Sequence, residues 1–424
     1  MERQKAIVLH PYLRTKESLV DTRTNESKLE EAIGLALAID LDVVFSQVFT
    51  LHKITPSTFI GKGKVDEIAT YVKAHAIKLV IIDNEITGIQ QRNLEEDMGC
   101  KVIDRTALIL EIFGSRARTK EGRLQVELAA QEYQKSRLVR SWTHLERQRG
   151  GSGFLGGPGE TQIESDRRAI RDYIAHIRRQ LQKVVKTREL HRKSRKKVPY
   201  KVVAIVGYTN AGKSTLFNRL TGAQVLAADK LFATLDPTMR VIKLPSGRKF
   251  ILSDTVGFIS NLPTELVAAF RATLEEVLEA DIILHVRDVS NPDSEEQKRD
   301  VINVMRDLGV EDKLENNAIE VLNKIDMLDS VHLVELKERI KGNNNIIPVS
   351  AVTGVGLDKL LEIIDEKTAE GNKVIDIEVD AGNGKVIAWV YANSEVVESH
   401  EKDGVMYFKL SISEKNKGKL EKML

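Results

Sequence analysis

Residues 207–214 read Gly-Tyr-Thr-Asn-Ala-Gly-Lys-Ser and match the phosphate-loop pattern Gly-x-x-x-x-Gly-Lys-Ser/Thr at every fixed position. An apolar, β-branched run at 202–206 precedes this stretch, and a helix-like segment at 215–220 follows it. In a strand-loop-helix unit of this kind, backbone N–H groups and the helix N-terminus point at phosphate oxygens. We expect Lys213 to contact the β- and γ-phosphates and Ser214 to bind Mg²⁺. A glycine turn without a ligand is the weaker alternative, because pattern and context agree.

Three further motifs each close an apolar strand downstream of this loop. Asp254-Thr-Val-Gly257 is expected to place Asp254 near Mg²⁺ and the N–H of Gly257 near the γ-phosphate. Asn323-Lys-Ile-Asp326 supplies a carboxylate that accepts hydrogens from N1 and N2 of guanine, a pair that adenine lacks. Ser350-Ala-Val352 adds a backbone N–H for the guanine oxygen. Together the four motifs predict a P-loop GTPase domain that binds GTP.

The composition is typical of a water-soluble protein with several cores. At 424 residues the chain suggests about three domains, and its single cysteine, Cys100, fits a reducing compartment. No apolar run is long enough to span a bilayer, the first residues carry no signal-peptide pattern, and no prenylation cysteine stands at the C-terminus. We therefore expect a cytoplasmic protein without a membrane anchor.

Residues 1–113 alternate strand-like and helix-like stretches, which predicts an N-terminal α/β domain with a mostly parallel sheet. The expected strands are 6–9, 43–49, 79–82 and 102–103, and the expected helices are 28–38, 65–75 and 90–98. Before the second helix, residues 59–64 (Phe-Ile-Gly-Lys-Gly-Lys) combine a glycine turn with two lysines. This segment either caps the helix or binds a phosphate group, and its spacing matches neither phosphate-binding fingerprint.

Residues 114–197 predict a basic antiparallel helical hairpin. Apolar residues recur at near-heptad spacing on either side of the glycine-rich stretch 150–159, in the sets Leu124, Leu128, Leu138, Trp142, Leu145 and Ile163, Ile170, Ile177, Val184. Thr161 and Glu164 form a capping-box pattern at the start of the second helix. Residues 114–200 hold 22 Lys and Arg against 9 Asp and Glu, a net +13. This imbalance favours an RNA-directed probe over a merely solvated coiled coil, and 192–197 either contacts RNA or acts as a linker.

Residues 198–368 form the expected GTP-binding domain, and residues 369–424 form an expected small α+β C-terminal domain. In the latter we expect strands at 374–379, 386–391 and 405–412, followed by a lysine-rich end. The complete fold prediction is therefore α/β: a P-loop GTPase domain with an N-terminal α/β domain, a helical hairpin and a small α+β C-terminal domain.

This sequence resembles the HflX family of ribosome-associated GTPases. The resemblance covers nearly the whole chain, and its specific marks are the hairpin loop Gly-Phe-Leu-Gly-Gly-Pro-Gly-Glu-Thr at 153–161 and Phe232-Ala-Thr-Leu-Asp236 in the first switch. It implies binding to the large ribosomal subunit, splitting or rescue of stalled ribosomes by the GTP form, and a hairpin tip that reaches towards the peptidyl-transferase region.

The resemblance also implies roles for individual residues. Thr234 is the switch threonine that binds Mg²⁺ beside Ser214, with Thr238 as the competing choice. The expected catalytic residues are Lys213, Thr234 and Gly257. The expected nucleotide-contacting residues are Gly207, Tyr208, Thr209, Asn210, Ala211, Gly212, Lys213, Ser214, Phe232, Ala233, Thr234, Leu235, Asp236, Asp254, Thr255, Val256, Gly257, Asn323, Lys324, Ile325, Asp326, Ser350, Ala351 and Val352.

Phe258 follows Gly257, where many GTPases place a glutamine that orients the attacking water. A phenyl ring cannot orient water, so we expect slow hydrolysis without help from the ribosome, from a switch rearrangement or from a monovalent cation. Asn210 stands where similar GTPases bind K⁺, and the equal alternative is that it only holds the loop.

The expected partners are the large ribosomal subunit and its rRNA, with no DNA and no integral membrane association, and we expect a monomer. The rival hypothesis is a GTP-regulated RNA-binding or RNA-remodelling protein. A membrane-recruited switch is disfavoured, because the positive charge lies on a coiled hairpin rather than on one amphipathic face.

Overall fold

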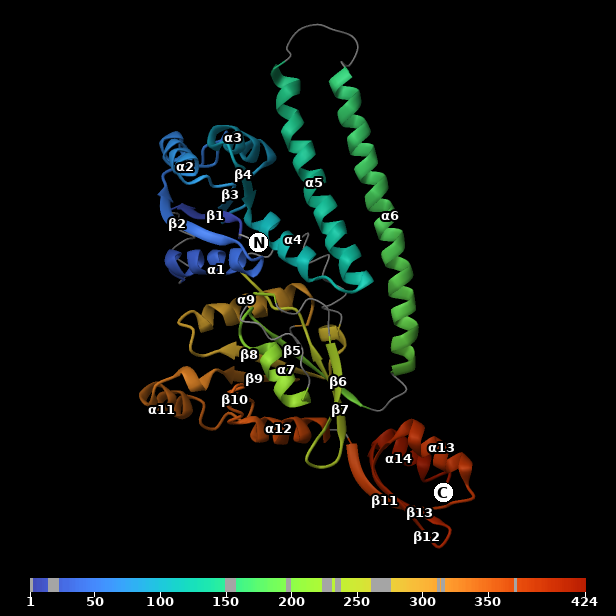
Figure 1. Cartoon of the computed structure of the whole chain (residues 1–424). Coiled ribbons are helices and arrows are strands. Elements are labelled where there is room, and N and C mark those ends of the chain that lie inside the picture. Colours follow the sequence, from blue (N-terminus) through green and yellow to red (C-terminus); the bar gives the residue numbers. More distant parts are fainter. Residues whose placement is uncertain are drawn as a thin grey trace. The chain divides into compact units, whose positions relative to one another are not determined.

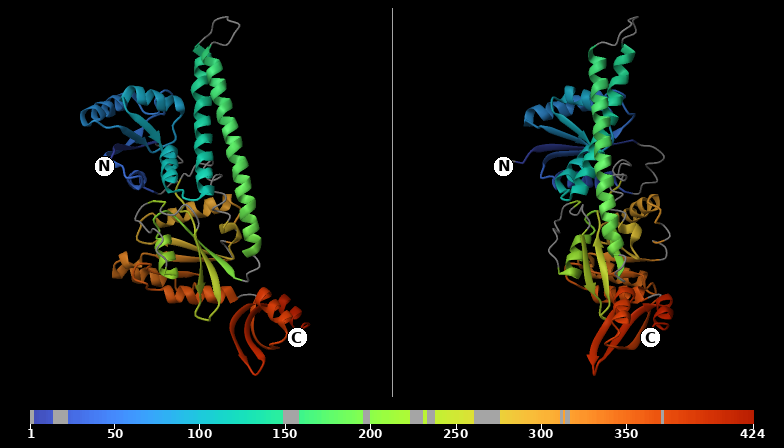
Figure 2. Two further views of the ribbon diagram at one scale, coloured as in Figure 1. Left: turned by 45° about the vertical axis from the view of Figure 1, so that its right-hand side comes forward. Right: turned by 90° about the vertical axis from the view of Figure 1, so that its right-hand side faces the viewer.

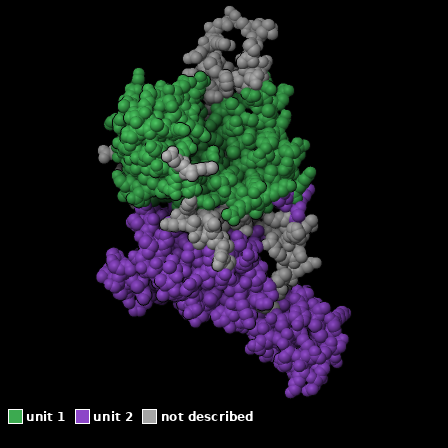
Figure 3. All heavy atoms as spheres, viewed as in Figure 1, with its two compact units in different colours: residues 1–183, 229–235, 261–271 green, residues 184–228, 236–260, 272–424 purple. Residues whose placement is uncertain are grey.

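A computed structural model of the chain describes residues 3–13, 23–148, 158–195, 200–222, 231–232, 238–260, 276–310, 313, 317–369 and 372–424 (Figure 1). The chain forms two compact units (Figure 3). The first comprises residues 1–183, 229–235 and 261–271, and the second comprises residues 184–228, 236–260 and 272–424. Each unit contains a sheet of mainly parallel strands with helices against it, which confirms the predicted α/β class.

The first unit begins with a wholly parallel sheet in the order β2-β1-β3-β4. Its strands are β1 (Lys5–Leu13), β2 (Asp42–Leu51), β3 (Leu79–Ile82) and β4 (Lys101–Asp104), and its helices are α1 (Asn25–Ala38), α2 (Lys62–His75), α3 (Gly88–Met98) and α4 (Arg105–Arg116). Side chains with polar oxygens cap three of these helices: Thr24, Thr87 and Asp104 each accept a backbone N–H of the first turn. The predicted βα alternation is confirmed, and α4 is an additional helix.

The glycine-containing segment at residues 59–64 forms the N-terminus of α2. Gly61 is the N-cap residue of α2, which begins three residues earlier than the sequence suggested. Lys64 pairs with Glu67 at 2.7 Å, and its ammonium lies 5.3 Å from the centre of the Phe49 ring. Because Lys64 already has these partners within the domain, the contacts favour the capping interpretation of residues 59–64 over the anion site.

Two long helices follow, α5 (Lys120–Gln148) and α6 (Pro158–Arg195), and they run side by side in opposite directions (Figures 1 and 2). All of α5 and residues 158–183 of α6 belong to the first unit. Leu124 and Ile177 of the predicted apolar sets are buried, and Ile174 is buried beside them. The side chain of Arg137 in α5 donates to Asp104 and to the carbonyl oxygen of Ile86, which fixes the hairpin to the N-terminal sheet.

The predicted capping box of the second hairpin helix is wrong. The helix α6 begins at Pro158, so Thr161 lies within the helix and does not cap it. Proline is well suited to a first helical turn, because its fixed φ fits the helix and its missing N–H would have no partner there. Residues 149–157 of the glycine-rich loop, including Phe154 and Leu155, lie outside the described residues.

The second unit contains a six-stranded sheet in the order β10-β9-β8-β5-β7-β6, in which only the β6–β7 pairing is antiparallel. The strands are β5 (Lys201–Gly207), β6 (Thr238–Lys243), β7 (Lys249–Asp254), β8 (Ile282–Asp288), β9 (Ala318–Asn323) and β10 (Ile346–Pro348). The accompanying helices are α7 (Lys213–Thr221), α9 (Ser294–Asp307), α11 (Ser330–Arg339), α12 (Leu357–Ala369) and the 3₁₀ turn η2 (Ile325–Met327). All the described nucleotide motifs lie at the carboxyl ends of these parallel strands, where α/β sheets bind ligands.

The C-terminal part of the second unit is an antiparallel sheet, β11 (Asn372–Asp380), β13 (Val405–Ser413) and β12 (Glu395–Lys402), with α13 (Gly384–Asn393) and α14 (Glu414–Leu420). The predicted strand at 386–391 is wrong, because these residues form α13. Val386 and Val390, one helical turn apart, are both buried, and Asn383 caps the helix, so packing overrides the β-branched composition. Within the described part of the chain, no helix is long and apolar enough to cross a membrane.

Candidate nucleotide site

The phosphate loop fits closely against neighbouring strand ends at two glycines. At Gly207, where φ is +155°, a Cβ atom would come within 2.2 Å of the carbonyl oxygen of Val286. At Gly212, where φ is +88°, it would come within 2.2 Å of the Asn323 side-chain amide. Only glycine suits these two positions, because any side chain would push the loop away from β8 and β9. The sequence pattern is thus required by the fold as well as by phosphate chemistry.

Lys213 is a buried cation at the start of α7. Its side chain is nearly inaccessible, and Nζ donates to the carbonyl oxygens of Gly207, at 3.1 Å, and Tyr208, at 2.6 Å. Burial lowers the pKa of Lys213 to about 8, although the negative charge of Asp254 acts in the opposite direction. No carboxylate of the described residues lies within ion-pair distance of Nζ, so the ammonium is suited to a phosphate group.

Ser214 and Asp254 form the candidate Mg²⁺ site. The Ser214 hydroxyl donates to Asp254 at 2.9 Å, and Asp254 is fully buried at the end of β7. A hydroxyl and a carboxylate are the hard oxygen donors that Mg²⁺ prefers, and Mg²⁺ in nucleotide sites takes its other ligands from phosphates and water. In the described residues no three His, Cys, Asp or Glu gather as a metal site. Thr234, with Ala233, Leu235 and Asp236, lies outside the described residues.

Gly257 and Phe258 are tied directly to the phosphate loop. Thr209 N–H donates to the carbonyl oxygen of Phe258 at 2.7 Å, and Phe258 N–H donates to that of Gly207 at 3.1 Å. A Cβ atom on Gly257 would come within 2.9 Å of Lys213 Nζ, so this glycine stands beside the ammonium. The Phe258 ring is 1% exposed and belongs to the interior. It therefore cannot be presented to solvent at the phosphate site in this conformation.

Asn323 holds together the motif that is predicted to bind the base. Its side chain donates to the carbonyl oxygen of Ala211 at 2.9 Å and accepts the N–H of Ala351 at 3.0 Å. One amide therefore links the phosphate loop, the end of β9 and the segment after β10. Lys324 adopts φ +66° and pairs with Asp288 at 2.7 Å. The Asp326 carboxylate lies in η2 at an exposed position, available to a base.

The remaining predicted residues are placed as follows. Thr255 is buried and donates its hydroxyl to the carbonyl oxygen of Ile205, while Val256 and Ile325 are also buried. Ser350 and Ala351 are buried and Val352 is 69% exposed. Asn210 is exposed with φ +60°.

Phe232 is placed differently from the other predicted residues. It belongs to the first unit, where its ring packs edge-on against Phe113 of α4 at 4.6 Å. The predicted contact of Phe232 with the nucleotide stays a prediction. The sequence motif did not indicate this packing, because the two residues are distant in the chain.

Other contacts at the site were also not predicted from the motifs. The Tyr208 hydroxyl accepts the N–H of Ser260 at 2.9 Å, which ties the phosphate loop to the segment after Gly257. The bridging role of Asn323 was likewise missed, since the motif predicted only that Asn323 contacts the nucleotide. Both sets of hydrogen bonds join segments that only the folded chain brings together. The residue types in the sequence gave no signal for these partners.

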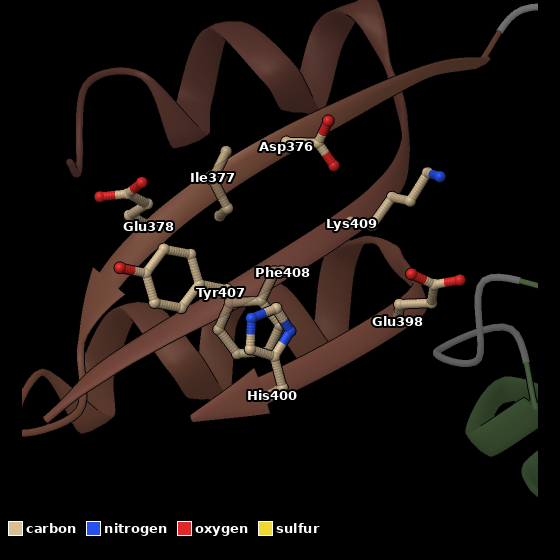
Figure 4. Close-up of a pocket in the computed structure, with 8 residues that line it drawn as sticks. All are labelled: Asp376, Ile377, Glu378, Glu398, His400, Tyr407, Phe408 and Lys409. Carbon is tan, nitrogen blue, oxygen red and sulfur yellow. The ribbon is translucent and has the colours of Figure 1, made fainter. Parts of the chain in front are cut away.

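A separate hollow lies on the open face of the C-terminal sheet (Figure 4). Its lining includes Asp376, Glu378 and Glu398, together with Lys409 and a His400 ring stacked on Tyr407. None of the predicted nucleotide-contacting residues lines it. Three carboxylates disfavour a polyphosphate there, so the phosphate loop stays the candidate nucleotide site.

Four family models match successive parts of the chain: GTP-binding GTPase N-terminal at residues 26–114, GTP-binding GTPase Middle Region at 116–195, 50S ribosome-binding GTPase at 202–324, and HflX C-terminal domain at 335–424. The GTPase HflX of Magnetococcus marinus is 48% identical over 92% of this chain and 89% of its own length. That of Escherichia coli is 45% identical over 86% and 83%, respectively.

A solved complex of SsGBP with GDP is similar in fold, with a TM-score of 0.50 and 25% identity, over 87% of this chain and 99% of that one. The family models match the N-terminal sheet and the hairpin as well as the GTP-binding domain. The predicted GTP-hydrolysing activity and the predicted family are both confirmed by these matches. The chain belongs to the GTPase HflX family.

Proposed function

We propose that this GTPase binds the large ribosomal subunit and, in its GTP form, splits or rescues stalled ribosomes, with the subunit stimulating hydrolysis. The support is the family model named 50S ribosome-binding GTPase, together with the basic hairpin. In α6 the cations Arg168, Arg171, Arg178, Arg179, Lys183 and Lys186 are all exposed. Arginine suits RNA, because its planar guanidinium binds phosphates in bidentate fashion and stacks on bases.

The nucleotide roles follow from the geometry of the loop. Lys213 neutralises the β- and γ-phosphates, the N–H of Gly257 donates to the γ-phosphate, and Asp326 selects guanine. Ser214 and Thr234 hold Mg²⁺ with the support of Asp254, and the ion adds positive charge at the phosphates. In this proposal residues 198–368 form the domain that senses GTP, and residues 114–197 form the hairpin that contacts rRNA. Residues 1–113 and 369–424 form the flanking domains.

Hydrolysis by the isolated chain is slow in this proposal, because Phe258 is buried and cannot orient water. The subunit completes the site by ordering the first switch. Single-turnover hydrolysis that is equally fast with and without large subunits would contradict this step.

Sedimentation with large subunits in the presence of GTP, GDP or a non-hydrolysable GTP analogue tests the switch. We expect co-sedimentation to be strongest with the analogue, and binding that ignores the nucleotide would overturn the proposal. A variant with Arg168→Glu, Arg171→Glu and Arg179→Glu should bind at least tenfold more weakly, because it replaces phosphate attraction with repulsion. The matched control, Lys337→Glu with Lys341→Glu and Lys359→Glu, makes the same charge change on exposed residues of the GTP-binding domain and should bind normally.

The second candidate is a GTP-regulated RNA-binding protein, which the same exposed cations favour. Salt-dependent binding to free structured RNA as tight as binding to subunits would support it. In either case we propose a cytoplasmic monomer that acts on RNA rather than on DNA or a membrane.

A further inference from the structure

The hydroxyl group of Thr209, the third residue of the phosphate loop, has no assigned role. Thr209 is 6% exposed, and its Oγ1 atom is buried without a hydrogen-bond partner among the described residues. Its backbone N–H is already used, since it donates to the carbonyl oxygen of Phe258 at 2.7 Å. A buried hydroxyl in a native protein normally finds a partner, so an unpartnered one in a binding loop points to a ligand.

Two other hydroxyl groups at the site are occupied. Thr255 donates to the carbonyl oxygen of Ile205 at 2.6 Å, and Ser214 donates to Asp254 at 2.9 Å. The Thr255 hydroxyl serves the fold, and the Ser214 hydroxyl pairs with the expected metal-linked carboxylate. The Thr209 hydroxyl has neither function, although it is comparably buried.

The position of Thr209 identifies which part of a nucleotide it faces. A Cβ atom built on Gly257 would lie 2.9 Å from Thr209 Cγ2, 3.1 Å from Thr209 Cα and 2.9 Å from Lys213 Nζ. The threonine side chain, the Gly257 backbone and the ammonium of Lys213 therefore converge on one small region. Lys213 and Gly257 are the groups that contact the terminal phosphate in the proposed site, and the guanine-binding residues Asn323 and Asp326 belong to a different strand end.

We propose that the Thr209 hydroxyl hydrogen-bonds the γ-phosphoryl group of GTP. The inference rests on the placement of the phosphates at Lys213 and Gly257. Because GDP has no γ-phosphoryl group, this bond favours GTP over GDP, and it holds the terminal phosphate for attack by water. The hydrogen bond thus helps to position the γ-phosphoryl group, although it does not replace a residue that orients water at Phe258. The side chain that makes this bond belongs to the phosphate loop itself.

Two substitutions separate the hydroxyl from the rest of the side chain. Thr209→Val keeps the shape and removes the hydroxyl, whereas Thr209→Ser keeps the hydroxyl and removes the methyl group. For Thr209→Val we expect affinity for a non-hydrolysable GTP analogue and the single-turnover hydrolysis rate to fall about tenfold or more, as for loss of one hydrogen bond to a charged group. Affinity for GDP should change less than twofold, and Thr209→Ser should stay within about threefold of the wild type in every measurement.

Thr368→Val is the matched control, because Thr368 is a buried helical threonine whose hydroxyl donates to the carbonyl oxygen of Asp365. It should leave both nucleotide affinities unchanged, and thermal melting of all variants reports folding. Three results would overturn the inference: Thr209→Val that behaves as wild type, a parallel loss of GDP and analogue affinity, or Thr209→Ser that fails like Thr209→Val. Normal GDP binding in every variant shows that the nucleotide site is intact, so failure here is distinct from failure of ribosome binding.

Discussion

The carboxyl ends of the two parallel sheets carry polar clusters of opposite kinds. In the N-terminal sheet, Arg105 donates to Asp83 at 2.6 Å and to Glu31 at 2.5 Å, and His10 contacts Asp83 at 2.8 Å. In the GTP-binding sheet, Lys213 contacts only carbonyl oxygens and the Thr209 hydroxyl has no partner among the described residues. Both clusters lie where α/β sheets commonly bind ligands.

The difference shows how a buried polar cluster that belongs to the scaffold can be told from one that awaits a ligand. Burial alone would raise the pKa of Asp83, but Arg105 and His10 outweigh burial and lower it. The opposite balance holds at Lys213, where burial dominates and lowers the pKa to about 8. Buried charges that are paired inside the protein are costly to separate, because removal of one partner leaves the other charge uncompensated. A buried charge without an ionic partner is instead a candidate for binding a ligand of opposite charge.

Removing the central cation of the N-terminal cluster should have the largest effect. Arg105→Leu leaves Asp83 and Glu31 buried without their shared partner, and we expect the free energy of unfolding to fall by about 3–5 kcal/mol. Urea unfolding, followed by a probe of the N-terminal domain, measures this loss. Arg92→Leu is the control: Arg92 pairs with Glu96 on the surface, where its side chain is 68% exposed, and should cost at most about 1 kcal/mol. Equal free energies of unfolding for the two variants would mean that the Arg105 cluster does not stabilise the N-terminal domain.

Lys213→Ala should give the reverse result. We expect GDP and GTP affinity to fall at least about a hundredfold, because the phosphates lose a charge-assisted contact in a buried site. Stability without nucleotide should not decrease, since the variant removes a buried cation that has no ionic partner among the described residues. Fluorescent-nucleotide titration and thermal melting give the two quantities. Strong destabilisation with little loss of affinity would mean that Lys213 belongs to the scaffold.

A buried histidine in the GTP-binding sheet makes the stability of this domain depend on pH. His285 of β8 is 4% exposed, and burial lowers its pKa to about 4, although Glu320 acts in the opposite direction. A histidine with a lowered folded-state pKa stabilises the protein fully above the unfolded value near 6.5, and this contribution is lost as pH falls towards 4. Relative to His285→Leu, the wild type should lose on the order of 3 kcal/mol between pH 7 and pH 4, measured by urea unfolding. Identical pH profiles for the two proteins would show that folding does not lower the pKa of His285.

The sequence was sufficient to predict the fold class, the family and the strand-end positions of the described nucleotide motifs, because glycine spacing and apolar runs are local. It could not predict that Asn323 bridges the phosphate loop to Ala351, since that bond joins three segments distant in the chain. The same limit applies to the salt-bridge cluster at Arg105, where charged residues looked like ordinary surface residues. For residues 386–391, the β-branched and aromatic composition predicted a strand, whereas the structure has the helix α13. The helix is determined by packing against the sheet, which a local pattern does not reveal.

Substitution of Asn210 should have the smallest effect on hydrolysis. It tests whether the polar cluster at the phosphate loop also binds a monovalent ion. Asn210 is exposed with φ +60°, a conformation that asparagine tolerates and glycine adopts freely, so Asn210→Gly removes the side-chain oxygen and keeps the loop backbone. If Asn210 binds K⁺, hydrolysis by the wild type should be severalfold faster in K⁺ than in Na⁺, and the variant should lose this preference at an unchanged rate in Na⁺. A K⁺ preference that survives the substitution would mean that Asn210 only shapes the loop. Because a distorted phosphate loop would slow hydrolysis in both ions, an unchanged rate in Na⁺ assigns a loss limited to K⁺ to the missing side chain.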